Sequence, residues 1–215
     1  MSGTVLIVGA TGLIGKAFLR QISNDKWYSE ISILARREVT EFKTISHFKQ
    51  HIIDFEKLQN YKNLINTDTI VCTLGTTIKK AGTQENFRRI DYGLPLQIAQ
   101  FGIENGVKNF ILVSAVGADP NSKVFYNRVK GELESDLQEL DFKSLHILQP
   151  SLLLGERDER RFAENFSKLI FKPFMSIIPW KYKPIYDHVL ANKIDSIIKN
   201  SKPGIFFYEG KSLYS

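Results

Sequence analysis

The sequence is poor in cysteine and has no long apolar run. Its single cysteine, Cys72, cannot form an intramolecular disulfide, and a lone thiol is typical of a reducing compartment. No apolar stretch approaches the length that is needed to span a membrane. The segment Met1 to Gly9 lacks the basic start and apolar core of a signal peptide. We therefore expect a cytoplasmic protein without a transmembrane segment.

Metal-ligand spacing is absent as well. The four histidines are His47, His51, His146 and His188, and none stands at a metal-binding interval from cysteine or carboxylate residues. Cys72 falls within an apolar run, where a small buried hydrophobe is the usual role, and we find no neighbouring base that would activate its thiol. The sequence therefore predicts no metal site and no thiol chemistry.

Positive charge is in mild excess. The 215 residues include 29 Lys and Arg against 23 Asp and Glu, which gives a formal net charge of +6 and a pI near 9.3. This balance favours anionic ligands such as phosphates. Acidic residues are mixed in throughout, and no basic run interleaves with a recognisable nucleic-acid module. We expect no sequence-specific nucleic-acid partner.

Short apolar runs alternate with amphipathic stretches along the first two thirds of the chain. The runs are Val5 to Val8, Ile31 to Leu34, Ile52 to Ile53, Thr69 to Leu74, Phe110 to Val113 and Leu145 to Leu148. The helical stretches are Leu13 to Ile22, the stripe of Leu94, Ile98, Phe101 and Ile103 that stops near Asn105–Gly106, and Lys123 to Leu140. Pro95 lies near the start of the second helix, which places Asp91 close to its N-cap. Apolar strands that alternate with helices predict an α/β fold with a doubly wound parallel sheet, the Rossmann fold.

The pattern changes after Pro150. The remaining residues are rich in Phe, Lys and Pro, with helices expected at Asp158 to Phe171 and Asp187 to Asn200 and a strand at Ile205 to Tyr208. This tail is too small to be an independent domain. We expect one domain over residues 1–215, in which 156–200 form a small substrate cap.

Basic and aromatic residues interleave on the first tail helix. They are Arg157, Arg160, Arg161, Lys168 and Lys172 on one side, and Phe162, Phe166 and Phe171 between them. The simplest interpretation is an amphipathic cap helix with a solvated face. An acidic protein partner, a membrane surface or an anionic substrate remains an alternative, as does a homodimer.

A glycine-rich turn follows the first predicted strand and opens the first predicted helix. The spacing Gly9-x-x-Gly12-x-x-Gly15 is the dinucleotide fingerprint in the context that the fingerprint requires. Gly9 makes the tight turn, Gly12 lets the backbone approach a diphosphate, and Gly15 lets the helix pack on the strand. The amides at the helix start then bind phosphate. We expect cofactor contacts from Gly9, Thr11, Gly12, Leu13, Ile14 and Gly15.

Two arginines follow the second predicted strand. Sites that prefer NAD carry Asp or Glu at that point, where the carboxylate binds the ribose 2′-hydroxyl. This strand ends instead in Arg36 and Arg37. A guanidinium suits a 2′-phosphate because it donates two parallel hydrogen bonds, so NADPH is the predicted cofactor. In the alternative, Arg36 stacks on the adenine and Arg37 is solvated.

The ends of the third and fourth predicted strands supply further cofactor contacts. Asp54 and Phe55 follow the third strand, where the fold places the adenine. The Asp54 carboxylate would accept from the adenine amino group, or it would cap a helix from Phe55 to Tyr61. Leu74, Gly75 and Thr76 end the fourth strand, and a glycine there allows close approach of the second ribose.

A tyrosine and a lysine four residues apart form the candidate catalytic group. Tyr126 and Lys130 share one face of a predicted helix, and Ser114 ends the preceding strand at the same edge of the sheet. In carbonyl reduction Tyr126 would give the proton, and Ser114 would orient the substrate oxygen. A Lys130 ammonium about 4–5 Å away, at an effective dielectric near 20, favours the phenolate by roughly 3–4 kcal/mol. We therefore expect a lowered Tyr126 pKa. Lys130 would also hold the nicotinamide ribose.

Together these motifs resemble the short-chain dehydrogenase/reductase superfamily in its atypical branch, namely the HIV-Tat-interacting-protein-like oxidoreductases and the NAD(P)H-binding NmrA-like proteins. The matching segments are 9–15, 72–77, 80–82, 114–119, 126–132 and 149–155. The resemblance implies a Rossmann fold, an NADPH preference and the catalytic roles given above. It also implies that Pro150, Leu152 and Leu153 lie beside the nicotinamide. Two positions depart from the pattern: Asp91 is the nearest counterpart of a frequent catalytic asparagine, and Gln149 replaces an arginine.

Two functions from different classes follow. The first is an NADPH-dependent oxidoreductase that reduces a small carbonyl substrate by hydride transfer, with Tyr126 as the proton donor. The alternative is a non-catalytic NADPH-binding regulator or assembly factor, because the branch includes regulators and because the tail is basic and aromatic. The intact Tyr-x-x-x-Lys pair favours the enzyme. A sugar-nucleotide epimerase ranks last, since the tail after Pro150 is short for a nucleotide sugar.

Overall fold

The computed structural model describes residues 3–155 and 179–214. The main sheet contains β1 (Gly3–Val8), β2 (Tyr28–Ala35), β3 (Phe48–Ile52), β4 (Thr69–Cys72), β5 (Asn109–Val113), β6 (Ser144–Leu148) and β9 (Gly204–Tyr208). In this described part the strand order is β3-β2-β1-β4-β5-β6-β9, and every neighbouring pair is parallel. The doubly wound Rossmann fold is thus confirmed.

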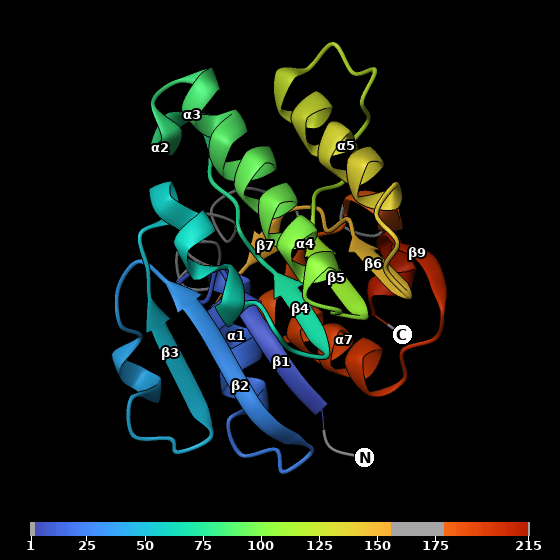
Figure 1. Ribbon diagram of the computed structural model, residues 1–215. Helices are drawn as coiled ribbons and strands as arrows, with labels where there is room; N and C mark the ends of the chain where they lie inside the picture. The colour runs from blue at the N-terminus through green and yellow to red at the C-terminus, as the bar shows by residue number, and fades with distance from the viewer. Residues whose placement is uncertain (1–2, 156–178, 215) are drawn as a thin grey trace.

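Helices cover both faces of the sheet. They are α1 (Leu13–Ile22), α2 (Ile78–Ala81), α3 (Gln84–Arg88), α4 (Leu94–Glu104), α5 (Phe125–Gln138) and α7 (Asp187–Lys199). In Figure 1, α4 and α5 lie in front of the sheet and α1 and α7 lie behind it. Short 3-10 turns occur at Thr40–Phe42, Phe55–Leu64, Trp180–Tyr182 and Gly210–Leu213, and β7 (Leu153–Leu154) pairs with β8 (Ile185–Tyr186) outside the main sheet.

Two apolar layers explain why the central strands are apolar without interruption. On β1, Val5 and Ile7 join the core under α1 and α7. Leu6 and Val8, which point the other way, join the core under α4 and α5. A strand that is buried on both faces needs apolar side chains at every position rather than at every second one. This is the pattern that the sequence shows.

The third strand differs from the prediction. We expected it at Ile52 to Ile53, and it runs from Phe48 to Ile52. Within the described residues, β3 is the edge of the sheet and pairs only with β2. An edge strand is partly solvated, so polar side chains such as Lys49 are tolerated within it and no apolar run marks its position.

The start of α4 also corrects the prediction for Asp91. Helix α3 continues through a π-helical turn, Arg89–Gly93, directly into α4. Asp91 lies inside that turn and is completely buried, so it does not cap α4. The predicted end is confirmed, because α4 stops at Glu104 and Gly106 takes a φ of 79°.

The C-terminal helix packs on the sheet instead of capping it. The predicted cap spans 156–200, and its first predicted helix, Asp158 to Phe171, lies outside the described residues. In contrast, α7 packs against α1 in the helical layer. Because its apolar side faces that layer, this part of the expected cap is a structural helix of the domain.

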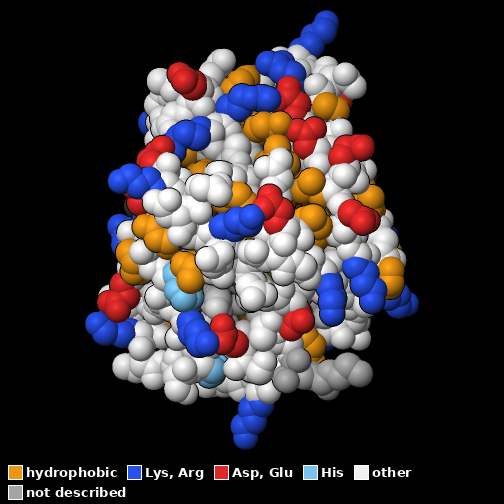
Figure 2. Space-filling view, viewed as in Figure 1, with side chains coloured by type: hydrophobic (Ala, Val, Ile, Leu, Met, Phe, Trp, Pro, Cys, Tyr) orange, Lys and Arg blue, Asp and Glu red, His pale blue; other side chains and the backbone are white. Residues whose placement is uncertain are grey.

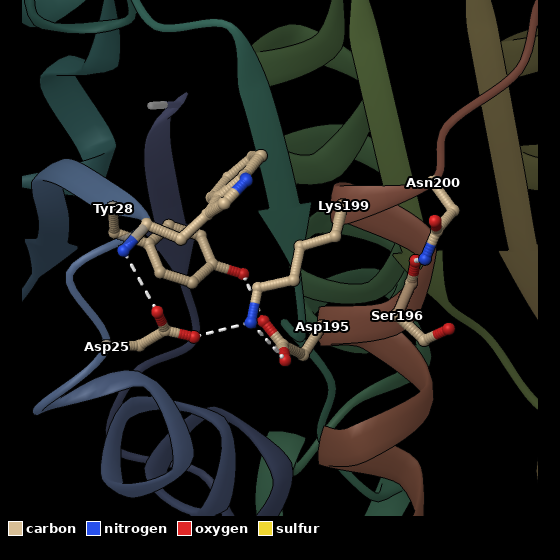
Figure 3. A network of polar contacts seen from close by, with 7 residues as sticks. Asp25, Tyr28, Asp195, Ser196, Lys199 and Asn200 are labelled. Carbon is tan, nitrogen blue, oxygen red and sulfur yellow. Dashed lines mark hydrogen bonds and ion pairs between the residues drawn. The ribbon is translucent and has the colours of Figure 1, made fainter. Parts of the chain in front are cut away.

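A polar network fixes the end of α7 (Figure 3). The Tyr28 hydroxyl donates to Asp195 Oδ1 over 2.6 Å. Lys199 Nζ lies 2.8 Å from Asp195 Oδ2 and also pairs with Asp25, which precedes β2. The network therefore ties the last turn of α7 to the start of β2.

Surface charge is mixed on the face that α4 and α5 cover. Figure 2 shows Lys and Arg side chains interspersed with Asp and Glu rather than gathered into a stripe of one sign. Ion pairs link Arg88 to Glu132 and Lys62 to Glu104. This arrangement gives no extended basic track along that face.

Candidate functional site

The glycine turn brings the start of α1 against the end of β1. Gly9 has a φ of 91°, and a side chain there would lie 2.6 Å from the Thr73 carbonyl. A side chain on Gly15 would lie 2.4 Å from the Gly9 carbonyl oxygen. Only glycine permits these approaches. No side chain caps α1, and its first turn contains no acidic residue, so its N-terminus suits an anion.

A cavity of about 700 Å³ opens from this turn along the C-terminal ends of β1, β2, β3 and β4. Many predicted cofactor residues line it, namely Gly9, Thr11, Gly12, Arg36, Asp54, Phe55, Leu74, Gly75 and Thr76. Others do not belong to its lining, namely Leu13, Ile14, Gly15, Arg37, Tyr126, Lys130, Pro150, Leu152 and Leu153. The volume falls within the usual range for small-molecule pockets.

Sequence reasoning missed several residues of the same cavity. Lys80, Asn86 and Arg89 line it from the segment that follows β4. Arg89 pairs with Glu56, which also lines the cavity. The one sequence signal was the polar, basic stretch after Gly75. That stretch contains no apolar periodicity to show which side it turns toward the site.

Asp54 caps the helical turn that follows it. Its carboxylate accepts from the Glu56 amide over 3.0 Å, which confirms the capping alternative. The same side chain lines the cavity. Arg36 also lines the cavity, and it makes no hydrogen bond or ion pair within 3–155 and 179–214. Its guanidinium is therefore available to an anionic ligand.

A buried ion pair lies just beyond the cavity. Lys130 Nζ is 2.8 Å from Asp91 Oδ1, and both side chains are almost fully buried. Asp91 also accepts from the Thr76 amide over 2.8 Å. Lys130 Nζ lies 3.9 Å from the position that a Gly75 side chain would occupy. Because Gly75 lines the cavity, its missing side chain leaves Lys130 close to the cavity end.

Tyr126 lies on α5 one turn before Lys130. Its ring packs against Phe87 with the centroids 5.5 Å apart. Burial raises the pKa of Tyr126, and that effect outweighs the opposing influence of Lys130. Asp91 adds to the rise because its carboxylate offsets the lysine charge. The expected lowering of the Tyr126 pKa is therefore wrong in this structure, since the sequence argument left out both burial and Asp91.

Ser114 follows β5 directly and is buried. Its amide donates to the Leu148 carbonyl over 2.8 Å, and the Val116 amide donates to the Pro150 carbonyl over 2.9 Å. These bonds hold the segments after β5 and β6 side by side. They place the predicted loop of Pro150, Leu152 and Leu153 next to that of Ser114.

An acidic residue that the sequence analysis did not select is buried beside Ser114. Glu134 lies on α5 four residues after Lys130 and is only 5% exposed. Its Oε2 accepts from Gln149 Nε2 over 2.8 Å. The Ser114 hydroxyl lies close enough to affect the pKa of the carboxyl group. However, neither Ser114 Oγ nor Glu134 Oε1 makes a hydrogen bond of good geometry in the described chain.

The chain is similar to several known proteins. The family model HIM1 matches residues 19–183. The chain is 36% identical over 170 residues to protein HTATIP2 of Rattus norvegicus, which covers 78% of this chain and 70% of that protein. It is 29% identical over 223 residues to protein FMP52-1 of Scheffersomyces stipitis, with coverage of 98% and 96%. The solved oxidoreductase ylbE from Lactococcus lactis shares the fold, with a TM-score of 0.71, 18% identity and coverage of 98% and 94%.

The relatives correct the expected location. The FMP52 proteins of Scheffersomyces stipitis, Candida albicans and Saccharomyces cerevisiae are all named as mitochondrial. The expectation of a cytoplasmic protein is therefore wrong. It rested on the lone cysteine and on the lack of a signal peptide and of a membrane-spanning stretch, and a lone cysteine does not distinguish one reducing compartment from another. Within the described residues, no helix has the length and apolar character to cross a membrane.

Proposed function

The chain belongs to the HIM1 family, and from this premise and the geometry of the site we propose that it is an oxidoreductase that uses NADPH to reduce a small carbonyl compound. The observation that carries the proposal is the position of Lys130. Its ammonium group is buried on the same face of α5 as Tyr126 and lies next to Gly75 at the cavity end. A cation thus lies beside a pocket that suits a dinucleotide, and Tyr126 is one turn away on the same helix.

The residues of the cavity suit the diphosphate, the adenine and the 2′-phosphate of NADPH. The uncapped start of α1 and the close-packed glycine turn suit a diphosphate. Arg36, which has no partner among the described residues, suits a 2′-phosphate at the other end. Asp54 and Phe55 lie where the adenine would bind, and Gly75 leaves room for the second ribose. When bound, the cofactor supplies the hydride.

The residues around Lys130 then supply the proton and stabilise the charge that its transfer leaves. A raised pKa keeps the Tyr126 phenol protonated at neutral pH, so that it can donate its proton to the substrate oxygen. The Lys130 ammonium, held by Asp91, stabilises the phenolate that this transfer leaves. Ser114 orients the substrate by a hydrogen bond to the same oxygen. The loop of Pro150, Leu152 and Leu153 borders the substrate.

The decisive test replaces Tyr126 by Phe. NADPH oxidation is measured with a panel of small aldehydes and ketones, and NADPH binding is measured by calorimetry. We expect kcat to fall by about 100-fold or more, while the Kd for NADPH changes by less than about threefold. Tyr92→Phe is the matched control, because the Tyr92 hydroxyl donates to Asp136 and Tyr92 does not line the cavity. Full activity of Tyr126→Phe would refute the assigned role.

An NADPH-binding regulator is the second candidate. The observation in its favour is the raised pKa of Tyr126, which burial causes and to which Asp91, the partner of Lys130, adds. A regulator needs no easy proton transfer. It requires NADPH binding without turnover, together with a protein partner whose affinity follows the NADPH/NADP ratio. A partner that ignores this ratio would remove the candidate.

A further inference from the structure

Glu134 is a buried acid for which the proposed reaction has so far no role. Tyr126, Lys130 and Glu134 follow one another at intervals of four residues, so they share one face of α5. A carboxyl group is rarely buried unless it is paired or has a function. Glu134 has no ion pair among the described residues, and its Oε1 lacks a hydrogen bond there.

The groups around this carboxyl come from three elements. Lys130, on the same helix, is the charged group that acts on it, and Lys130 is itself paired with Asp91. Gln149, which follows β6, donates to Oε2. Ser114, which follows β5, presents its hydroxyl. Gln149 occupies Oε2, whereas Oε1 and Ser114 Oγ are both buried without a hydrogen bond in the described residues.

The protonation state of Glu134 decides which way the Ser114 hydroxyl points. A serine has one hydrogen to donate, and an ionised carboxylate can only accept. An ionised Glu134 therefore draws that hydrogen toward itself and leaves Ser114 with lone pairs facing the substrate. A neutral Glu134 can donate its own hydrogen to Ser114 Oγ. The serine hydrogen is then available to the substrate oxygen.

We propose that Glu134 is a positioning residue that, in its protonated form, donates to Ser114 and thereby turns the serine hydroxyl toward the carbonyl oxygen of the substrate. This inference rests on the proposed carbonyl reduction. The ionised form reverses the hydrogen bond and withdraws the donor. Glu134 itself touches neither substrate nor cofactor.

The surroundings favour the protonated form over an extended pH range. Burial raises the pKa of Glu134, although Ser114, Gln149 and Lys130 oppose the rise. The neutral acid therefore persists to a higher pH than in an ordinary glutamate. Above that pKa, kcat/KM of the wild type should fall toward tenfold for each further pH unit. This decline comes before the loss of the Tyr126 proton, whose pKa is raised above an already high value.

The test compares the pH profiles of kcat/KM for the wild type, Glu134→Gln and Glu132→Gln. A glutamine at 134 can accept from Gln149 through oxygen and donate to Ser114 through nitrogen, so it imitates the neutral acid. We expect its kcat/KM to stay level where that of the wild type falls. Glu132→Gln is the matched control on the same helix, because Glu132 pairs with Arg88 at the surface, and it should retain the wild-type decline. An unchanged decline in Glu134→Gln would overturn the proposal, as would an equal loss at every pH.

Infrared difference spectroscopy provides a readout that does not need turnover. A neutral Glu134 gives a carboxylic C=O band that disappears in Glu134→Gln. If this acid donates to Ser114, Ser114→Ala should shift the band to higher frequency, because the hydrogen bond is lost. A band that ignores Ser114→Ala, or no band at all, overturns the proposal. Absence of wild-type turnover with any carbonyl refutes the proposed function and with it the role of Glu134, even where the band shift is present.

Discussion

The contrast between Arg36 and Arg37 predicts the cofactor preference. Both arginines are exposed after β2, but only Arg36 lines the cavity. Hydrogen bonds between charged partners contribute about 1.5–3 kcal/mol each, which corresponds to about 10- to 100-fold in Kd. Replacing Arg36 by Ala should weaken NADPH binding by that factor. Replacing Arg37 by Ala should change it by less than about threefold.

The assay is calorimetric titration of wild type and both variants with NADPH and NADH. If Arg36 binds the 2′-phosphate, Arg36→Ala weakens NADPH and leaves NADH unchanged, since NADH lacks that group. If Arg36 stacks on the adenine instead, both nucleotides weaken together. The preference should also shrink as salt is raised, because exposed charges are screened. An Arg36→Ala variant that retains wild-type affinity for NADPH, or equal effects from both arginines, would refute the assignment.

Two stability predictions follow. Gly15→Ala places a methyl group 2.4 Å from the Gly9 carbonyl oxygen, so it should lower the free energy of unfolding in a urea titration by about 1–3 kcal/mol and weaken NADPH binding. A methyl group at Gly93 meets nothing within 4 Å, so Gly93→Ala should raise the free energy of unfolding by about 0.5–1 kcal/mol in the same titration. Lys199→Met breaks the ion pairs at the end of α7 and should cost about 1–2 kcal/mol at neutral pH. Lys199 lowers the pKa of Asp25, so the stabilisation by this ion pair is present above the pKa of Asp25 in the unfolded chain and is lost on acidification. The difference in melting temperature between variant and wild type should therefore shrink below about pH 4. Equal melts at neutral pH would contradict this assignment.

The parts of the fold that could be predicted are those in which local pattern and burial agree. The β1 run is apolar because both of its faces are covered, and the glycine turn needs its spacing for steric reasons that act within a few residues. The edge strand β3 was expected only at Ile52 to Ile53, because partial solvation removes the apolar signal from its earlier residues. The tail was assigned to a cap, whereas the partner of α7 is α1, a helix that is distant in sequence.

The candidate site likewise contains features that local sequence spacing predicts and features that depend on elements distant in sequence. Tyr126 and Lys130 could be placed on one face because helical spacing is local. The partner of Lys130 could not, since Asp91 reaches it through a π-helical turn that joins two helices. The direction of the Tyr126 pKa shift was therefore misjudged, since burial raises this pKa and the Asp91 charge adds to the rise. Glu134 gave no signal, as its role depends on Ser114 and Gln149 from two other elements.

Hydride transfer from the cofactor to the substrate tests the central claim most directly. The protein is incubated with the carbonyl panel and with NADPH that carries deuterium on one or the other face of nicotinamide C4, and the alcohol products are analysed by mass spectrometry. The account predicts an alcohol that carries one deuterium on its carbinol carbon from only one of the two labelled cofactors. It also predicts that Tyr126→Phe forms very little of that product. NADPH that binds while no alcohol forms from either labelled cofactor would contradict the account.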